Sequence, residues 1–250
     1  MTLMHTSDDN NHDTTMDPVA TGVDLTSSST PLSRLQREIV DLFEARQYKS
    51  CEILARMEKS RAEREGRDPR MAVAMLGDCA HETQQYRKAV SFYRCIESPK
   101  HRWKEAQCLQ ALGNVVEASA VLEMVPQNAR TLAMNMTLGN LYVASGRSNA
   151  AQESFLDSLN QNPYALEAIE WLATLGADKN LVLASIKKGF VGVTEEDVMV
   201  PVLDFAAAHF AKSRHQNASA LQQFVALERL YPNNVYLLLN IGTIQVRIQS

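Results

Sequence analysis

Four cysteines and six histidines are the residues of this chain that could carry out nucleophilic or metal chemistry. A thiol nucleophile needs a base and an orienting group beside it. His81 lies two residues from Cys79, which places the two side chains on different sides of a helix. His209 and His215 have no cysteine or carboxylate cluster at metal-ligand spacing. The pattern therefore predicts packing roles for the cysteines, groove or surface positions for the histidines, and no enzymatic activity.

Composition narrows the kinds of partner. The net charge is −4 and the pI about 5.9, whereas a nucleic-acid-binding protein needs a basic surface. The sequence has no phosphate-binding loop, dinucleotide fingerprint, nucleophile elbow or apolar run of membrane-spanning length. Its first residues lack a secretion signal, so we expect a reducing compartment inside the cell. We expect no cofactor, metal, small-molecule substrate, nucleic acid or membrane partner.

A repeated spacing of small and large residues organises the chain. A small residue is followed 12 positions later by a second small residue and 16 positions later by a large apolar one. The sets are Gly77/Ala89/Tyr93, Ala106/Ala118/Leu122, Gly139/Ala151/Phe155 and Ala208/Ala220/Phe224. The lead positions Gly139, Ala173, Ala208 and Gly242 are 34, 35 and 34 residues apart, and about 34 is the tetratricopeptide period. This spacing predicts an all-α solenoid of antiparallel helical hairpins, in which small residues allow close helix approach and large ones fill the space between hairpins.

The chain divides into four parts. We expect a disordered polar tail over residues 1–31, a loose helical hairpin over 32–60, a charged linker over 61–69 and the solenoid over 70–250. The expected repeats are 70–98, 99–131, 132–165, 166–200 and 201–234, with a partial repeat at 235–250. Gly189 stands where repeat 166–200 should have a large residue, which predicts a short or bent second helix there. The apolar run that opens 235–250 indicates either a truncated chain, which we favour, or a bare binding or dimer surface.

The concave face of such a solenoid is lined by the first helix of each repeat, and we expect partners to bind there. The expected groove residues are Trp103, Gln107, Met136, Asn140, Val143, Phe205 and His209. Trp103 and Phe205 are aromatic anchors of the kind that dominate interfaces. A clamp for a terminal carboxylate is not expected, because Met136 stands where its lysine would be. The first hairpin is expected to provide a dimerisation surface made of Leu35, Ile39, Leu42, Phe43 and Leu54.

Several segments of the solenoid resemble one family of tetratricopeptide proteins. They are WKEAQCL at 103–109, VLEMVP at 121–126, NMTLGNLY at 135–142 and NPYALEAI at 162–169. They are similar to the N-terminal half of subunit seven of the anaphase-promoting complex, a ubiquitin ligase of the cell cycle. The resemblance implies a non-catalytic scaffold that acts in mitosis and cell division. It also implies a homodimer, docking on other tetratricopeptide subunits of the complex, and a location in nucleus and cytoplasm.

Two other functions remain open from the sequence. The chain could be an adaptor or cochaperone that binds short peptides in its concave groove, and it would then lose peptide affinity when Asn140 or Trp103 is changed. It could also be an enzyme with a hidden Cys–His pair, and replacing the four cysteines by alanine would then abolish turnover.

Overall fold

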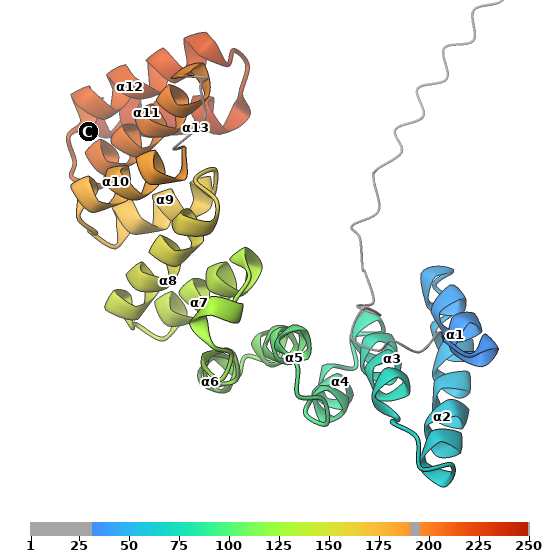
Figure 1. Ribbon diagram of the computed structural model, residues 1–250. Helices are drawn as coiled ribbons and strands as arrows, with labels where there is room; N and C mark the ends of the chain where they lie inside the picture. The colour runs from blue at the N-terminus through green and yellow to red at the C-terminus, as the bar shows by residue number, and fades with distance from the viewer. Residues whose placement is uncertain (1–31, 191–195, 250) are drawn as a thin grey trace, which may run out of the picture.

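The computed structural model describes residues 32–190 and 196–249, and within these ranges every regular element is a helix. The elements are α1 (Arg34–Glu44), α2 (Tyr48–Arg64), α3 (Arg70–Glu82), α4 (Tyr86–Tyr93), α5 (Pro99–Ala111), α6 (Val115–Glu123), the 3-10 helix η1 (Gln127–Ala129), α7 (Leu132–Ala144), α8 (Ser148–Gln161), α9 (Leu166–Thr174), α10 (Lys179–Gly189), α11 (Glu196–Ser213), α12 (Asn217–Leu230) and α13 (Val235–Gln249). Figure 1 shows antiparallel hairpins stacked in chain order. The predicted all-α solenoid is therefore confirmed. The predicted tail at 1–31 lies outside the described residues.

The hairpin turns fall where small or turn-forming residues interrupt the apolar pattern. Gly113 and Gly146 adopt φ values of 80° and 73° between the two helices of their repeats, a conformation that favours glycine. In the first hairpin the same turn is made by Arg46, whose φ is 57°. Helix α1 starts with a capping box: Ser33 Oγ accepts from the Gln36 amide at 3.3 Å, and Gln36 Oε1 accepts from the Ser33 amide at 2.9 Å.

The spacing that recurs along the chain has a direct packing reason, which is clearest at the lead glycines. A Cβ atom added to Gly77 would lie 2.6 Å from Cε1 of Tyr93, and one added to Gly139 would lie 2.5 Å from Cε1 of Phe155. Both rings are fully buried. The aromatic side chain of the second helix therefore lies flat against the first helix of its own repeat, and only glycine leaves room for it.

The same rings reach the next repeat, as the spacing predicts. Phe155 stacks on Trp171 of α9 with ring centres 6.1 Å apart and an interplanar angle of 4°. Tyr93 lies 6.1 Å from the ring of His101 in α5, and its hydroxyl donates to Asp78 Oδ1 at 2.7 Å. Lys104 Nζ donates to the same oxygen at 2.6 Å, so one buried carboxylate joins α3, α4 and α5. Since the Asp78 carboxylate accepts from Tyr93 of α4 and from Lys104 of α5, it helps to fix the position of α5 on the first full repeat.

The charged linker predicted at 61–69 is partly wrong. Helix α2 continues to Arg64, so the connection to α3 is limited to residues 65–69. Ion pairs at helical spacing support the last turns, with Lys59–Glu63 at 2.6 Å and Arg61–Glu65 at 2.9 Å. Ala62 is 1% exposed against the body of the protein. Charged residues with high helix propensity thus extend the helix where the sequence alone suggested a loop.

The repeat predicted at 166–200 is irregular in a different way from the expected one. Helix α10 is continuous over its 11 residues, but it packs mainly on α8 and very little on its own partner α9. A Cβ atom on Gly189 would lie 2.9 Å from Cγ of Pro163, so the large residue that the repeat pattern called for would not fit there. Helix α11 already begins at Glu196, five residues before the expected boundary, and contains Pro201.

The residues expected to form a dimer surface point mostly into the molecule. Ile39 and Phe43 are 0% and 7% exposed and pack in a cluster with residues of α2 and α3. Leu35, Leu42 and Leu54 are half-buried against the same cluster. The expectation is corrected for Ile39 and Phe43, which attach the first hairpin to the solenoid because α3 presents an apolar face beside them. For Leu35, Leu42 and Leu54 it stays a prediction. The exposed apolar side chains of this hairpin are Ile53 and Met57 of α2, at 47% and 58%.

Candidate binding groove

Five of the expected groove residues lie on α5 and α7. They are half-buried, and none of them lines the cavity that is described below. They are Trp103, Gln107, Met136, Asn140 and Val143. The indole Nε1 of Trp103 donates to Thr137 Oγ1 at 3.3 Å, so this side chain joins α5 to α7. Both Trp103 and Met136 pack against the central core. Trp103 is therefore as much a contact between repeats as a free anchor for a partner.

The two expected groove residues of α11 are both buried, and they differ in whether they line a cavity. Phe205 is 8% exposed and forms part of a cavity wall. His209 is 3% exposed, lies 4.5 Å from Phe205 and 5.2 Å from Phe224 between ring centres, and is covered by Tyr236 of α13. Its expected place on the groove surface is corrected, because the first turn of α13 closes over it.

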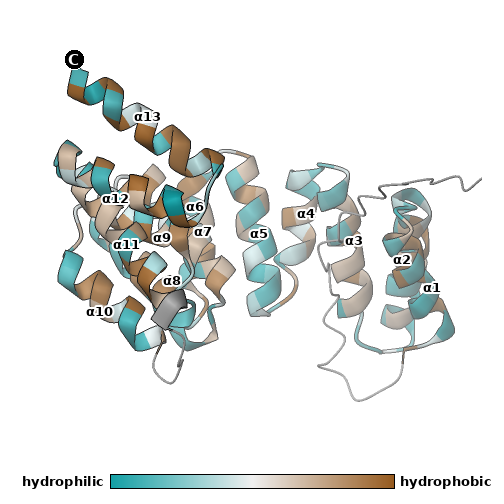
Figure 2. Ribbon diagram, turned by 90° about the horizontal axis from the view of Figure 1, so that it is seen from above, coloured by the Kyte–Doolittle hydropathy of each residue, from teal (hydrophilic) through white to brown (hydrophobic). Residues whose placement is uncertain are grey.

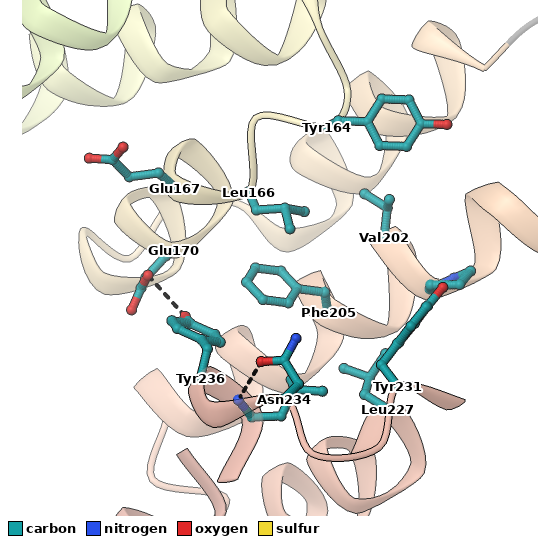
Figure 3. Close-up of a pocket in the computed structure, with 12 residues that line it drawn as sticks. Tyr164, Leu166, Glu167, Glu170, Val202, Phe205, Leu227, Tyr231, Asn234 and Tyr236 are labelled. Atoms are coloured by element: carbon teal, nitrogen blue, oxygen red, sulfur yellow. Dashed lines mark hydrogen bonds between the residues drawn. The ribbon is translucent and has the colours of Figure 1, made fainter. Parts of the chain in front are cut away.

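A cavity of about 610 Å³ lies between α9, α11, the end of α12 and the start of α13, and we call it the α9–α13 groove (Figure 3). It is lined by Tyr164, Leu166, Glu167, Glu170, Pro201, Val202, Phe205, Leu227, Tyr231, Asn234, Tyr236 and Leu237. Phe205 and Val202 lie at its floor and the tyrosines around its edge (Figure 3). Tyr164, Tyr231 and Tyr236 are 50%, 48% and 39% exposed. The groove therefore offers partly exposed aromatic rings above an apolar floor.

Only one of the seven expected groove residues, Phe205, lines this groove. The sequence analysis missed Leu166, Tyr231 and Tyr236, which come from the boundaries between repeats. The available signal was the Tyr-Pro boundary at Pro232, which points to Tyr231, and the Asn-Pro boundary at Pro163, which points to the lining residue Tyr164. Because the groove forms only where α9 and α13 approach across α11, no single repeat reveals it.

A chain of hydrogen bonds fixes the edge of the groove. The Tyr236 hydroxyl lies 3.0 Å from Glu170 Oε2 and 2.9 Å from His209 Nε2. A phenol has one proton and a carboxylate only accepts, so Oη donates to Glu170 and accepts from the Nε2–H of His209. Burial, and then the charge of Glu170, raises the pKa of Tyr236. Burial, and then the charge of Lys212, lowers the pKa of His209 to about 4, so this imidazole is neutral at pH 7.

The charge of the groove is one-sided. Glu167 and Glu170 of α9 are its charged lining residues, and no lysine or arginine is among the residues that line it. Lys212 interacts electrostatically with Glu170. Its Nζ donates a hydrogen bond to Asn240 Oδ1 on α13 at 2.6 Å. The groove therefore combines an apolar floor with an anionic edge, which is a surface for binding.

The residues considered for nucleophilic or metal chemistry lie elsewhere. Cys51, Cys79 and Cys108 are buried, and Cys95 is exposed on α4's C-terminal turn. Burial, and then the charge of Asp78, raises the pKa of Cys108 to about 12, which keeps this thiol protonated. Within the described residues, no group of histidines, cysteines and carboxylates could hold a metal ion. The buried cysteines therefore serve as small core residues.

Within residues 32–190 and 196–249, every helix is too short or too polar to cross a membrane.

The chain is similar to known proteins in sequence and in fold. No family model matches it. Anaphase-promoting complex subunit 7 of Arabidopsis thaliana is 28% identical over 158 residues, which is 61% of this chain and 28% of the relative. The human protein of the same name is 30% identical over 161 residues, 62% of this chain and 27% of the relative. The matched segment thus covers less than a third of each relative's length.

A solved structure is similar to this chain in fold. It comes from a study of pilF of Pseudomonas aeruginosa, and it superposes with a TM-score of 0.50 at 15% identity over 85% of this chain and 96% of that chain. The chain therefore has a tetratricopeptide-type α-solenoid fold and is related in sequence, over 61–62% of its length, to subunit 7 of the anaphase-promoting complex.

Proposed function

We propose that this chain is a non-catalytic scaffold that assembles with other tetratricopeptide subunits of an anaphase-promoting ubiquitin ligase. The observation that carries the proposal is the 28–30% identity to subunit 7 proteins over 61–62% of the chain. The all-helical architecture supports it, since solenoids of this kind offer long surfaces to partners. The role belongs to the cell cycle, mitosis and cell division, in nucleus and cytoplasm.

Self-association belongs to the same proposal. Ile53 and Met57 stand one turn apart on α2, and both are about half exposed. We assign the homodimer contact to this strip rather than to Ile39 and Phe43, which are buried in the monomer. A second copy would cover two apolar side chains that now face solvent.

The test is to tag the chain, express it in dividing cells of its source and identify the co-purifying proteins by mass spectrometry. The proposal expects other ubiquitin-ligase scaffold subunits together with an untagged second copy of the chain. The variant Ile53→Asp/Met57→Asp should lose the second copy, while Val116→Asp, at a position 74% exposed on α6, should keep it. If no ligase subunit is recovered, the proposal fails.

The adaptor function remains the second candidate, and the α9–α13 groove is the observation that favours it. An adaptor would bind free short peptides, and chaperones alone would co-purify with it. A scaffold instead keeps its partner subunits when groove residues are changed, because its contacts are spread over many repeats. Tagged Phe205→Ser separates the two, provided that circular dichroism shows an intact fold.

A further inference from the structure

The α9–α13 groove carries a preference for one kind of ligand. Its volume of about 610 Å³ falls within the range of sites that bind small ligands or several side chains of a peptide. Leu166, at 39% exposure, lies beside the buried Val202 and Phe205, so an apolar side chain of a ligand would find an apolar surface there (Figure 3). Burial of such a side chain is the main source of affinity in a groove of this kind.

The anionic edge determines what should accompany that apolar side chain. Glu167 is exposed and Glu170 is half-buried, and both lie on one side of the groove, on α9 (Figure 3). No lining residue offsets these two charges. A lysine or arginine of the ligand would therefore gain a charge-assisted hydrogen bond, and an arginine would also gain contact with the ring of Tyr231 or Tyr236.

Two other occupants are disfavoured by charge. Residues 1–31 of this chain contain five aspartates and no lysine or arginine, so the groove would repel them. A terminal carboxylate would meet the two glutamates with no cationic lining group to bind it. The charges of the groove therefore favour an internal segment of another protein over these two occupants.

We propose that the α9–α13 groove binds an internal segment of a partner protein, in which a leucine-, isoleucine- or methionine-sized side chain is followed or preceded within four residues by lysine or arginine. The apolar side chain packs on Phe205 and the cation is held by Glu167 and Glu170. This inference goes beyond the scaffold role, because it specifies a ligand by its chemistry whichever complex the chain joins.

The experiment uses the full chain and a defined set of fluorescein-labelled, C-terminally amidated peptides. Each has a Gly-Ser frame that carries one apolar residue (Leu, Ile, Met or Ala) and one charged residue (Arg, Lys or Glu), separated by one to four positions. Fluorescence anisotropy should show the tightest binding for Leu, Ile or Met with Arg or Lys. Replacing the cation by Glu should weaken binding about tenfold or more. Equal binding of the Glu peptides, absence of binding throughout the set, or binding that requires a free terminal carboxylate would overturn the proposal.

A pair of variants then assigns the site. Glu167→Gln/Glu170→Gln removes both charges and leaves an acceptor for the Tyr236 hydroxyl, so the local hydrogen bond can persist. Its matched control is Glu97→Gln/Glu153→Gln, which removes two exposed carboxylates outside the groove. We expect the groove variant to weaken binding about fivefold to tenfold and the control to leave it unchanged. Equal effects of the two variants would place the ligand elsewhere. Neither result bears on co-purification with ligase subunits, so failure here is distinguishable from failure of the scaffold proposal.

Discussion

Gly139 of α7 and Gly242 of α13 occupy the same lead position in two repeats, and their surroundings are opposite. A Cβ atom on Gly139 would lie 2.5 Å from the ring of Phe155, whereas a Cβ atom on Gly242 would have nothing within 4 Å. Around Gly242 the apolar side chains Leu239 and Val246 are 66% and 67% exposed, and Figure 2 shows α13 projecting from the body with hydrophobic residues along its length. The contrast teaches that the ring of the second helix, rather than the first helix itself, makes glycine necessary.

The largest expected effect comes from removing the aromatic ring of Phe155. Phe155→Ala removes a fully buried aromatic side chain that contacts both α7 and α9, and should lower the free energy of unfolding by about 3–5 kcal/mol. Leu239→Ala, on the exposed face of α13, should change it by less than about 0.5 kcal/mol. Urea denaturation followed by circular dichroism measures both. Similar losses would mean that the face of α13 is as well packed as the α7–α8 repeat.

The next-largest effect tests whether the first turn of α13 covers His209. The pKa of His209 is about 4 in the fold and about 6.5 when unfolded, so the unfolded chain binds the additional proton between these values. Stability contributed by neutral His209 is complete above about pH 6.5 and is lost as the pH falls, by about 3 kcal/mol near pH 4. His209→Gln should remove this share of the acid destabilisation.

Urea denaturation at about pH 7, 5.5 and 4.5 compares the two proteins, and the difference between their pH slopes isolates His209 from the carboxylates. His215→Gln is the control, since His215 is exposed and should follow the unmodified chain. Identical slopes for His209→Gln and the unmodified chain would show that Tyr236 does not cover this imidazole in solution.

A smaller effect is expected from Gly139→Ala. The new methyl group would force the Phe155 ring to move and should cost about 1–3 kcal/mol. Adding Phe155→Leu should reduce this penalty, because the contact that Cβ disturbs is then gone. A double-mutant cycle on unfolding free energies measures the coupling. Strictly additive losses would argue against the ring–glycine contact.

The smallest effect, and one of opposite sign, is expected from Gly242→Ala. Alanine should stabilise α13 by about 0.5–1 kcal/mol, because the position is helical and surrounded by open space. Thermal unfolding at two protein concentrations checks it. A destabilisation that depends on concentration would show instead that a second copy packs over Gly242.

Much of the fold follows from the sequence because each repeat is a local unit. The spacing of Gly77 and Tyr93, or of Gly139 and Phe155, reports a contact between two helices that adjoin in the chain. The end of α2 was missed because a run of charged residues is also typical of a linker, although opposite charges four residues apart, such as Lys59 and Glu63, favour a helix.

The groove was less predictable than the repeats. Glu170 and Tyr236 are 66 residues apart, and their contact depends on how far α9 and α13 turn towards each other across α11. The repeat between them is irregular, since Gly189 lies against Pro163 at a position where the other repeats have a large side chain. Sequence periodicity carries no record of this angle, so Phe205 was found and its neighbours were not.

The weak packing between α9 and α10 has a mechanical consequence. A chain pulled from its two ends transmits the load through each hairpin in turn, and a hairpin resists in proportion to the contact between its own helices. In α7–α8 that contact includes a ring against a glycine, whereas α9 and α10 hardly touch each other and are joined through α8 and α11, on which both of them pack. Under tension this repeat should therefore transmit the load through α8 and α11 rather than through its own hairpin, so its resistance depends on the neighbouring repeats.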